Sequence, residues 1–179
     1  FIIDRSGSMN EPATDSLTGA NSQKNKMDVA KAELITSLAA LTDDDSFNIV
    51  SYSNDIERWS KAMQKATSET RKKAGSYVEK EVVALGGTNI FDALREGFLI
   101  AGVGATEKNL ASPVDTIFFL TDGHPTVGEV TDPEEILGRV RDWDRLAKVV
   151  LHAVGVGKDH DGVFLRRLAE GNGGQYVAR

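Results

Sequence analysis

The chain has 179 residues, of which 40% are hydrophobic and 27% are charged, a composition that suits one globular domain with one packed core. A formal net charge of −6 gives no electrostatic case for binding nucleic acid and disfavours anionic membrane surfaces. The lack of cysteine excludes disulfides, zinc–thiolate sites and thiol catalysis. No apolar run approaches the roughly 18 residues of a membrane span.

Short apolar runs, rich in β-branched residues, predict the strands. Three of the runs are nearly continuous rather than alternating, which is typical of parallel strands covered on both faces. Ile56–Ser60 follows a cluster of turn residues and predicts an antiparallel edge strand. In chain order, the predicted strands are Phe1–Ile3, Phe47–Tyr52, Ile56–Ser60, Val114–Leu120, Val149–Val156 and Gln175–Ala178.

Apolar side chains at helical spacing predict helices between these strands. Asn89 and Asp132 can cap two of the helices, and Pro133 suits a first turn. Lys61–Ala84 is polar and predicts a looser, exposed helix. The alternation of strands and helices predicts an α/β fold: a doubly wound, mostly parallel sheet with one antiparallel edge strand and helices on both faces. The apolar stripes are Ala30, Leu34, Leu38 and Leu41; Ile90, Leu94, Phe98 and Ala101; Ile136, Val140 and Trp143; and Leu165, Leu168 and Ala169.

Polar oxygen donors follow the predicted strands. The first strand ends in Asp4, with Ser6 and Ser8 at alternate positions beyond it, Thr88 lies in a segment that opens a helix, and Asp122 follows the strand that ends at Leu120. In open α/β sheets, ligands bind beyond the carboxyl ends of strands. Carboxylate and hydroxyl oxygens suit Mg²⁺, with Mn²⁺ or Ca²⁺ as alternatives. Two carboxylates would balance a divalent ion, and a remaining coordination position could accept a carboxylate from outside.

Three motifs carry a family resemblance: "DRSGSM", "GGTNIFDAL" and "FFLTDGHPTVG". At these residues the sequence resembles von Willebrand factor type A domains with a metal-ion-dependent adhesion site (MIDAS). Within this family it is most similar to bacterial domains and to those of inter-alpha-trypsin inhibitor heavy chains. The resemblance implies a Rossmann-like sheet with a Mg²⁺ site above it. It also implies that some ligands reach the metal directly, others through water, and that a partner's acidic side chain completes the shell. Carried over by position, the ligands are Asp4, Ser6, Ser8, Thr88 and Asp122.

The whole chain, residues 1–179, is therefore expected to be a single type A domain. Family members usually have a longer first strand and a final helix, so we expect the start of that strand and the final helix to be missing from this segment. The longest irregular stretch, Asn10–Asn25, is either a functional loop or a disordered insertion. The compartment is not encoded in these residues, although the resemblance slightly favours an extracellular or cell-envelope location.

Enzymatic alternatives fit less well, and we expect no enzyme activity. In haloacid-dehalogenase-type phosphatases a second aspartate acts as general acid where this chain has Ser6. No Gly-x-Gly-x-x-Gly follows the first strand, and no Gly-x-Ser-x-Gly elbow is present. A serine hydrolase would also need a nearby base, for which His124 is the candidate on the expected metal-bearing face, with His152 and His160 placed elsewhere.

The sequence thus predicts a divalent-cation-dependent protein-binding module that holds a carboxylate of a partner protein. The loops Asn10–Asn25 and His124–Glu129 would select that partner. An alternative keeps the fold but makes the domain part of an ATPase-driven assembly of the chelatase or MoxR-like kind. A Mg²⁺-dependent phosphohydrolase is a third possibility. The oligomeric state stays open.

Overall fold

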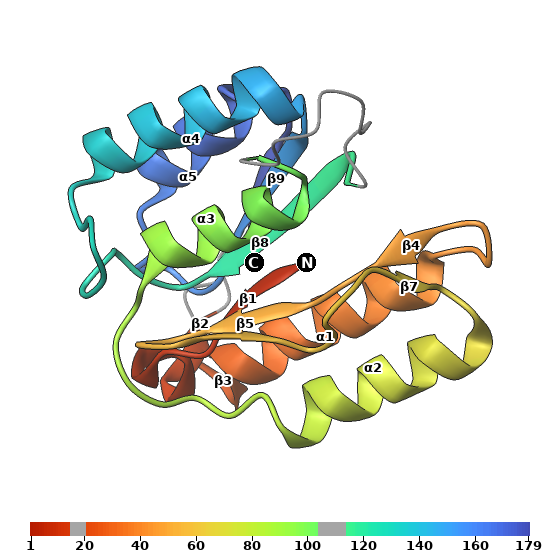
Figure 1. Ribbon diagram of the computed structural model, residues 1–179. Helices are drawn as coiled ribbons and strands as arrows, with labels where there is room; N and C mark the ends of the chain where they lie inside the picture. The colour runs from red at the N-terminus through yellow and green to blue at the C-terminus, as the bar shows by residue number, and fades with distance from the viewer. Residues whose placement is uncertain (15–20, 104–113) are drawn as a thin grey trace.

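The computed structural model describes residues 1–14, 21–103 and 114–179 (Figure 1). A six-stranded sheet runs through the molecule in the order β10-β9-β8-β1-β5-β6. Neighbouring strands are parallel except for β6, which is antiparallel to β5 at the edge, as the sequence predicts. The strands of this sheet are β1 (Ile2–Asp4), β5 (Val50–Tyr52), β6 (Ile56–Arg58), β8 (Thr116–Thr121), β9 (Val150–Gly155) and β10 (Tyr176–Ala178).

Helices cover both faces of the sheet, so the predicted doubly wound architecture is confirmed (Figure 1). One face carries α3, α4 and α5, and the other carries α1 and α2. The capping predictions are also correct: the Asn89 and Asp132 side chains accept hydrogen bonds from the first turns of α3 and α4. The helices are α1 (Lys26–Ala40), α2 (Ser68–Lys80), α3 (Ile90–Ile100), α4 (Pro133–Ala147) and α5 (Gly162–Glu170).

The central strand β1 joins the two cores. Ile2 packs into the core beneath α3, α4 and α5, whereas Ile3 packs into the core beneath α1 and α2. Successive side chains of a strand point to opposite faces, so β1 is anchored on both sides of the sheet. Burying each aliphatic side chain contributes about 1.5–3 kcal/mol. This anchoring fixes the position at which β1 ends, at Asp4.

The predicted strand Phe47–Tyr52 is interrupted in the structure. Its first part belongs to β4 (Ser46–Phe47), which pairs with β7 (Gln64–Lys65) in a separate two-stranded sheet. Asn48 causes the break, because its side-chain carbonyl accepts from the Ile49 N–H at 2.8 Å while its amide donates to the Ser60 carbonyl at 2.8 Å. A polar side chain bonded to the backbone takes the place of ladder hydrogen bonds.

The predicted helix Lys61–Ala84 is wrong at both ends. α2 spans only Ser68–Lys80, because Thr67 caps it by accepting from the Thr70 N–H. It is not a loose surface helix either: Ala74 and Val78 are fully buried, and α2 packs against α1.

The stretch Asn10–Asn25 is partly ordered into a hairpin. β2 (Pro12–Thr14) pairs antiparallel with β3 (Asn21–Asn25), and α1 begins directly afterwards with Asn25 as its cap. The expectation of a wholly irregular loop is therefore wrong for its two ends, while residues 15–20 lie outside the described part of the chain. Before the hairpin, a short 3₁₀ helix covers Gly7–Asn10. Among the described residues, no helix is both long enough and apolar enough to cross a membrane.

Candidate metal centre

The candidate site lies where the strand order of the sheet reverses. From β1 the chain passes through α1 to β5 on one side, and it later returns to β8 on the other side of β1. The carboxyl ends of β1 and β8 therefore form the edge at which doubly wound folds bind their ligands. Ile3 is in register with Leu120, so Asp4 and Thr121 end neighbouring strands, and Asp122 follows directly.

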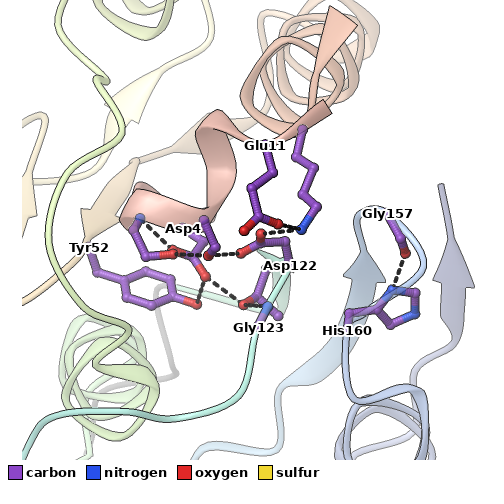
Figure 2. A network of polar contacts seen from close by, with 11 residues as sticks. Asp4, Glu11, Tyr52, Asp122, Gly123, Gly157 and His160 are labelled. Atoms are coloured by element: carbon purple, nitrogen blue, oxygen red, sulfur yellow. Dashed lines mark hydrogen bonds and ion pairs between the residues drawn. The ribbon is translucent and has the colours of Figure 1, made fainter. Parts of the chain in front are cut away.

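Three loops form the candidate site: the first follows β1 at residues 4–8, the second precedes α3 at residues 86–89, and the third follows β8 at residues 122–129. Asp4 is fully buried at the start of the first loop and accepts hydrogen bonds from three other residues (Figure 2). Its Oδ1 accepts from the Ser6 N–H at 2.7 Å, and its Oδ2 accepts from the Thr121 hydroxyl at 2.6 Å and the Tyr52 hydroxyl at 3.2 Å. Burial raises the pKa of Asp4 from 3.8 to about 6, although the hydrogen bonds from Thr121 and Ser6 oppose this rise. The carboxylate is therefore fixed in place but is costly to ionise without a compensating cation.

A chain of oxygen atoms joins the first loop to the third. The Ser6 and Ser8 hydroxyl oxygens lie 3.1 Å apart, and the Ser8 hydroxyl donates to Asp122 Oδ1 at 2.9 Å. Figure 2 shows Asp4 and Asp122 on either side of this link, with Tyr52 beside Asp4 and Glu11 beside Asp122. The alternate spacing of the two serines thus directs both hydroxyls toward the loop that carries Asp122.

The second loop is bonded to both of the others. The Gly7 N–H donates to the Gly86 carbonyl at 2.8 Å, which joins the first and second loops. Thr88 donates its backbone N–H to the Thr126 hydroxyl at 2.8 Å, and its carbonyl accepts from the Thr126 N–H at 3.0 Å. A Cβ added at Gly123 would lie 3.6 Å from Thr88 Oγ1, so the Thr88 hydroxyl lies next to the third loop. The structure therefore brings all the sequence-predicted residues to one place, and their role as ligands stays a prediction.

The donor set fits a hard divalent cation. The described residues contain no group of three or more His, Cys, Asp or Glu side chains placed to hold a metal. The site instead offers carboxylate and hydroxyl oxygens, which suit an ion that keeps part of its water shell, as Mg²⁺ does. Because the hydroxyls add no charge, two carboxylates are enough to balance the ion.

Sequence reasoning missed a lysine that contacts Asp122. The Lys26 ammonium group hydrogen bonds to Asp122 Oδ2 at 3.0 Å and to Glu11 Oε2 at 2.7 Å. Burial alone would lower the pKa of Lys26, but its hydrogen bonds to Glu11 and Asp122 raise the pKa above the ordinary value of 10.5. A signal was present, since Lys26 lies four residues before Ala30 and so on the buried stripe of α1.

The two hydroxyl donors to Asp4 were also missed. Tyr52 and Thr121 end the strands on either side of β1, and Tyr52 is in register with Asp4. Both are ordinary strand residues in the sequence. Their role depends on β1 lying between β5 and β8, which only the strand order reveals.

The histidines lie outside this network. His124 is exposed, and its Nδ1 lies 3.4 Å from Asp161 Oδ2. His160 contacts the Gly157 carbonyl and the Tyr176 hydroxyl, apart from the two aspartates (Figure 2). His152 lies in β9, where it stacks on Phe118. None of these contacts pairs a histidine with Ser6 or Ser8 as a serine nucleophile would require.

Comparison with known proteins identifies the family. The family model of the von Willebrand factor type A domain matches residues 17–178. The chain belongs to this family. Inter-alpha-trypsin inhibitor heavy chain H4 of Homo sapiens is 34% identical over 175 residues, covering 97% of this chain and 17% of that protein. The Sus scrofa heavy chain H4 is 35% identical over 175 residues with the same coverage. This chain thus spans 17% of the length of these relatives.

Solved structures share the fold. A von Willebrand factor type A protein from Catenulispora acidiphila superposes with a TM-score of 0.74 at 21% identity, covering 99% of this chain and 37% of that one. Proximal thread matrix protein 1 from the mussel byssus, solved with a zinc-occupied MIDAS motif, has a TM-score of 0.68 at 15% identity, covering 99% of this chain and 42% of that one. At these identities the likeness establishes the type A fold alone.

Proposed function

We propose that this type A domain binds one divalent cation and uses it to hold an acidic group of a partner protein. Mg²⁺ is the proposed ion, with Mn²⁺ or Ca²⁺ as alternatives. The observation that carries the proposal is the convergence of three distant loops on the oxygen network between Asp4 and Asp122. The proposed ligands are Asp4, Ser6, Ser8, Thr88 and Asp122.

The proposed ligands divide into two carboxylates and three hydroxyls. Asp4, whose oxygens already accept three hydrogen bonds, supplies negative charge on the buried side of the site and orders the first loop. The hydroxyls of Ser6, Ser8 and Thr88 present neutral oxygens, and Asp122 presents the second carboxylate. When bound, the cation supplies a Lewis-acidic position at which an incoming carboxylate can coordinate.

Two findings support a metal in this site. The buried Asp4 carboxyl group has a raised pKa, and a nearby cation would stabilise its ionised form. The byssus protein of the same fold is described with zinc in its MIDAS motif, so the fold can hold a metal at the corresponding motif. The oxygen-only donor set of this chain favours a harder ion than zinc.

The proposed role is recognition and not turnover. The relatives with the highest similarity reported above are inhibitor heavy chains, and none of the histidine contacts provides a base for Ser6 or Ser8. The partner would be selected by the loops that surround the site, including residues 124–129 beside Thr88. The positive charge of the bound cation is what would select an acidic group on the partner.

Isothermal titration calorimetry, which measures the affinity and stoichiometry of Mg²⁺ binding, tests the proposal. The wild-type domain should bind one ion, and Thr88→Val, which removes one hydroxyl at nearly constant volume, should weaken binding at least tenfold. Thr116→Val is the matched control, because Thr116 begins β8 at the opposite end from Asp122. Equal Mg²⁺ affinity in all three proteins would remove Thr88 from the site, and a wild-type domain that binds no divalent cation would refute the proposed function.

A further inference from the structure

Lys26 and Glu11 form an ion pair of very unequal burial at the edge of the candidate site. The Lys26 side chain is 4% exposed, whereas the Glu11 side chain is 59% exposed. The same ammonium group lies 3.0 Å from Asp122 Oδ2, and Asp122 Oδ1 accepts from Ser8. Asp122 therefore lies between a fixed positive charge and the proposed cation, and the second partner of that charge, Glu11, is exposed. Figure 2 shows Glu11 beside Asp122.

The fold makes specific room for this lysine. Gly157 follows β9 with a φ of +74°, and a Cβ added there would lie 2.9 Å from Lys26 Cε. The glycine thus lets the aliphatic stem of Lys26 pass close to the backbone. Burying an ammonium group costs several kcal/mol unless carboxylates compensate it. Asp122 provides compensation inside the protein, and Glu11 provides it from the surface.

Charge balance shows what this arrangement favours. Two carboxylates and one ammonium group carry a single net negative charge, so a divalent cation leaves the group of Asp4, Asp122 and Lys26 with a single net positive charge. One further carboxylate makes the site neutral. Glu11 already supplies that carboxylate in the free domain, through a contact with Lys26 that an exposed side chain can give up.

Building on the function proposed above, we propose that Lys26 is a second anchor for the partner's carboxylate and that Glu11 occupies this anchor until the partner binds. The incoming acidic group then meets both the cation and the ammonium group, and Glu11 is released to solvent. Glu11 acts as an internal competitor, so it lowers the affinity for every acidic ligand. Lys26 has the opposite effects on the two ligands: it repels the cation and attracts the carboxylate.

Water-proton relaxation of the Mn²⁺-loaded domain, titrated with acetate, tests this proposal. Acetate that replaces coordinated water lowers the relaxation enhancement, and acetamide serves as the uncharged control. Glu11→Gln should bind acetate two- to fivefold more tightly. This change in affinity corresponds to the free energy that a partly exposed ion pair contributes. Glu69→Gln is the matched control, because it removes the same charge from an exposed pair with Lys73 in α2.

Lys26→Met provides the second measurement. It should weaken acetate binding at least threefold while Mn²⁺ binds as tightly as in wild type or more tightly, since a like charge is gone. A lysine that only positioned Asp122 would instead weaken Mn²⁺ binding when replaced. Unchanged acetate affinity in Glu11→Gln, or parallel loss of Mn²⁺ and acetate in Lys26→Met, overturns the inference and leaves cation binding intact. A wild-type domain that binds no Mn²⁺ refutes the proposed function, and this inference falls with it.

Discussion

Replacing Asp4 by asparagine should stabilise the metal-free domain at neutral pH. Asp4 is fully buried, and its pKa is raised from 3.8 to about 6, chiefly by burial. Holding this carboxyl group ionised at pH 7 therefore costs about 3 kcal/mol, at 1.36 kcal/mol for each of roughly two pKa units. Asparagine removes that cost. It can still accept from the Ser6 N–H, and the hydroxyls of Tyr52 and Thr121 can rotate to accept from its amide.

The effect should depend on pH with a definite sign. The folded carboxyl group has the higher pKa, so the folded state holds the proton more tightly than the unfolded state does. Its stabilising contribution is fully present below pH 3.8 and is lost as the pH rises through about 6. The stability advantage of Asp4→Asn should therefore be small near pH 4 and should grow to about 3 kcal/mol by pH 7.5.

Urea denaturation in EDTA at several pH values between 4 and 7.5 measures this difference. Subtracting the wild-type free energy of unfolding from that of the variant at each pH cancels the contribution of titrating groups that do not interact with Asp4. A stability difference that stays constant with pH, or one that favours the wild type as the pH rises, would show that burial does not destabilise the ionised form of Asp4.

Other substitutions test separate parts of the structure. Asp122→Asn should lower the stability of the metal-free domain by about 1–3 kcal/mol in urea denaturation, because it leaves the buried Lys26 ammonium without its inner partner; an increase in stability would contradict this reading. Gly157→Ala should cost about 1–2 kcal/mol for the positive φ alone, and the contact of the new Cβ with the Lys26 side chain should add a further loss. In a double-mutant cycle this further loss should disappear with Lys26→Ala; additive effects of the two substitutions would argue against the contact. Ile3→Ala should lower the free energy of unfolding by about 2–5 kcal/mol, and a loss below 1 kcal/mol would mean that β1 is not the packed centre of the sheet.

Much of the fold was predictable because its elements have local signatures. Nearly continuous apolar strands such as β8 and β9 predict a sheet covered on both faces, and the caps at Asn89 and Asp132 mark helix starts without reference to the rest of the chain. The break at Asn48 was not predictable, because it depends on a hydrogen bond to the distant Ser60 carbonyl.

The site shows the same division. Its proposed ligands fall in recognisable motifs, so their convergence could be expected from sequence. Tyr52 and Thr121 could not be assigned to Asp4, because their role arises only when β5 and β8 flank β1. The spacing of Lys26 from Ala30 predicts that Lys26 is buried, but this pattern does not indicate which carboxylates it contacts. No sequence pattern indicated the role of Glu11, because its contact with Lys26 joins residues on either side of a hairpin.

The central claim is that the oxygens of three loops surround a single hard cation. The most direct measurement is a crystal of the wild-type domain soaked in Mn²⁺, with the ion located from its anomalous scattering. One strong peak within coordination distance of the Ser6 and Ser8 hydroxyls, and close to Thr88 and Asp122, is the predicted result. A peak elsewhere on the molecule, or an empty site at saturating Mn²⁺, would contradict the account.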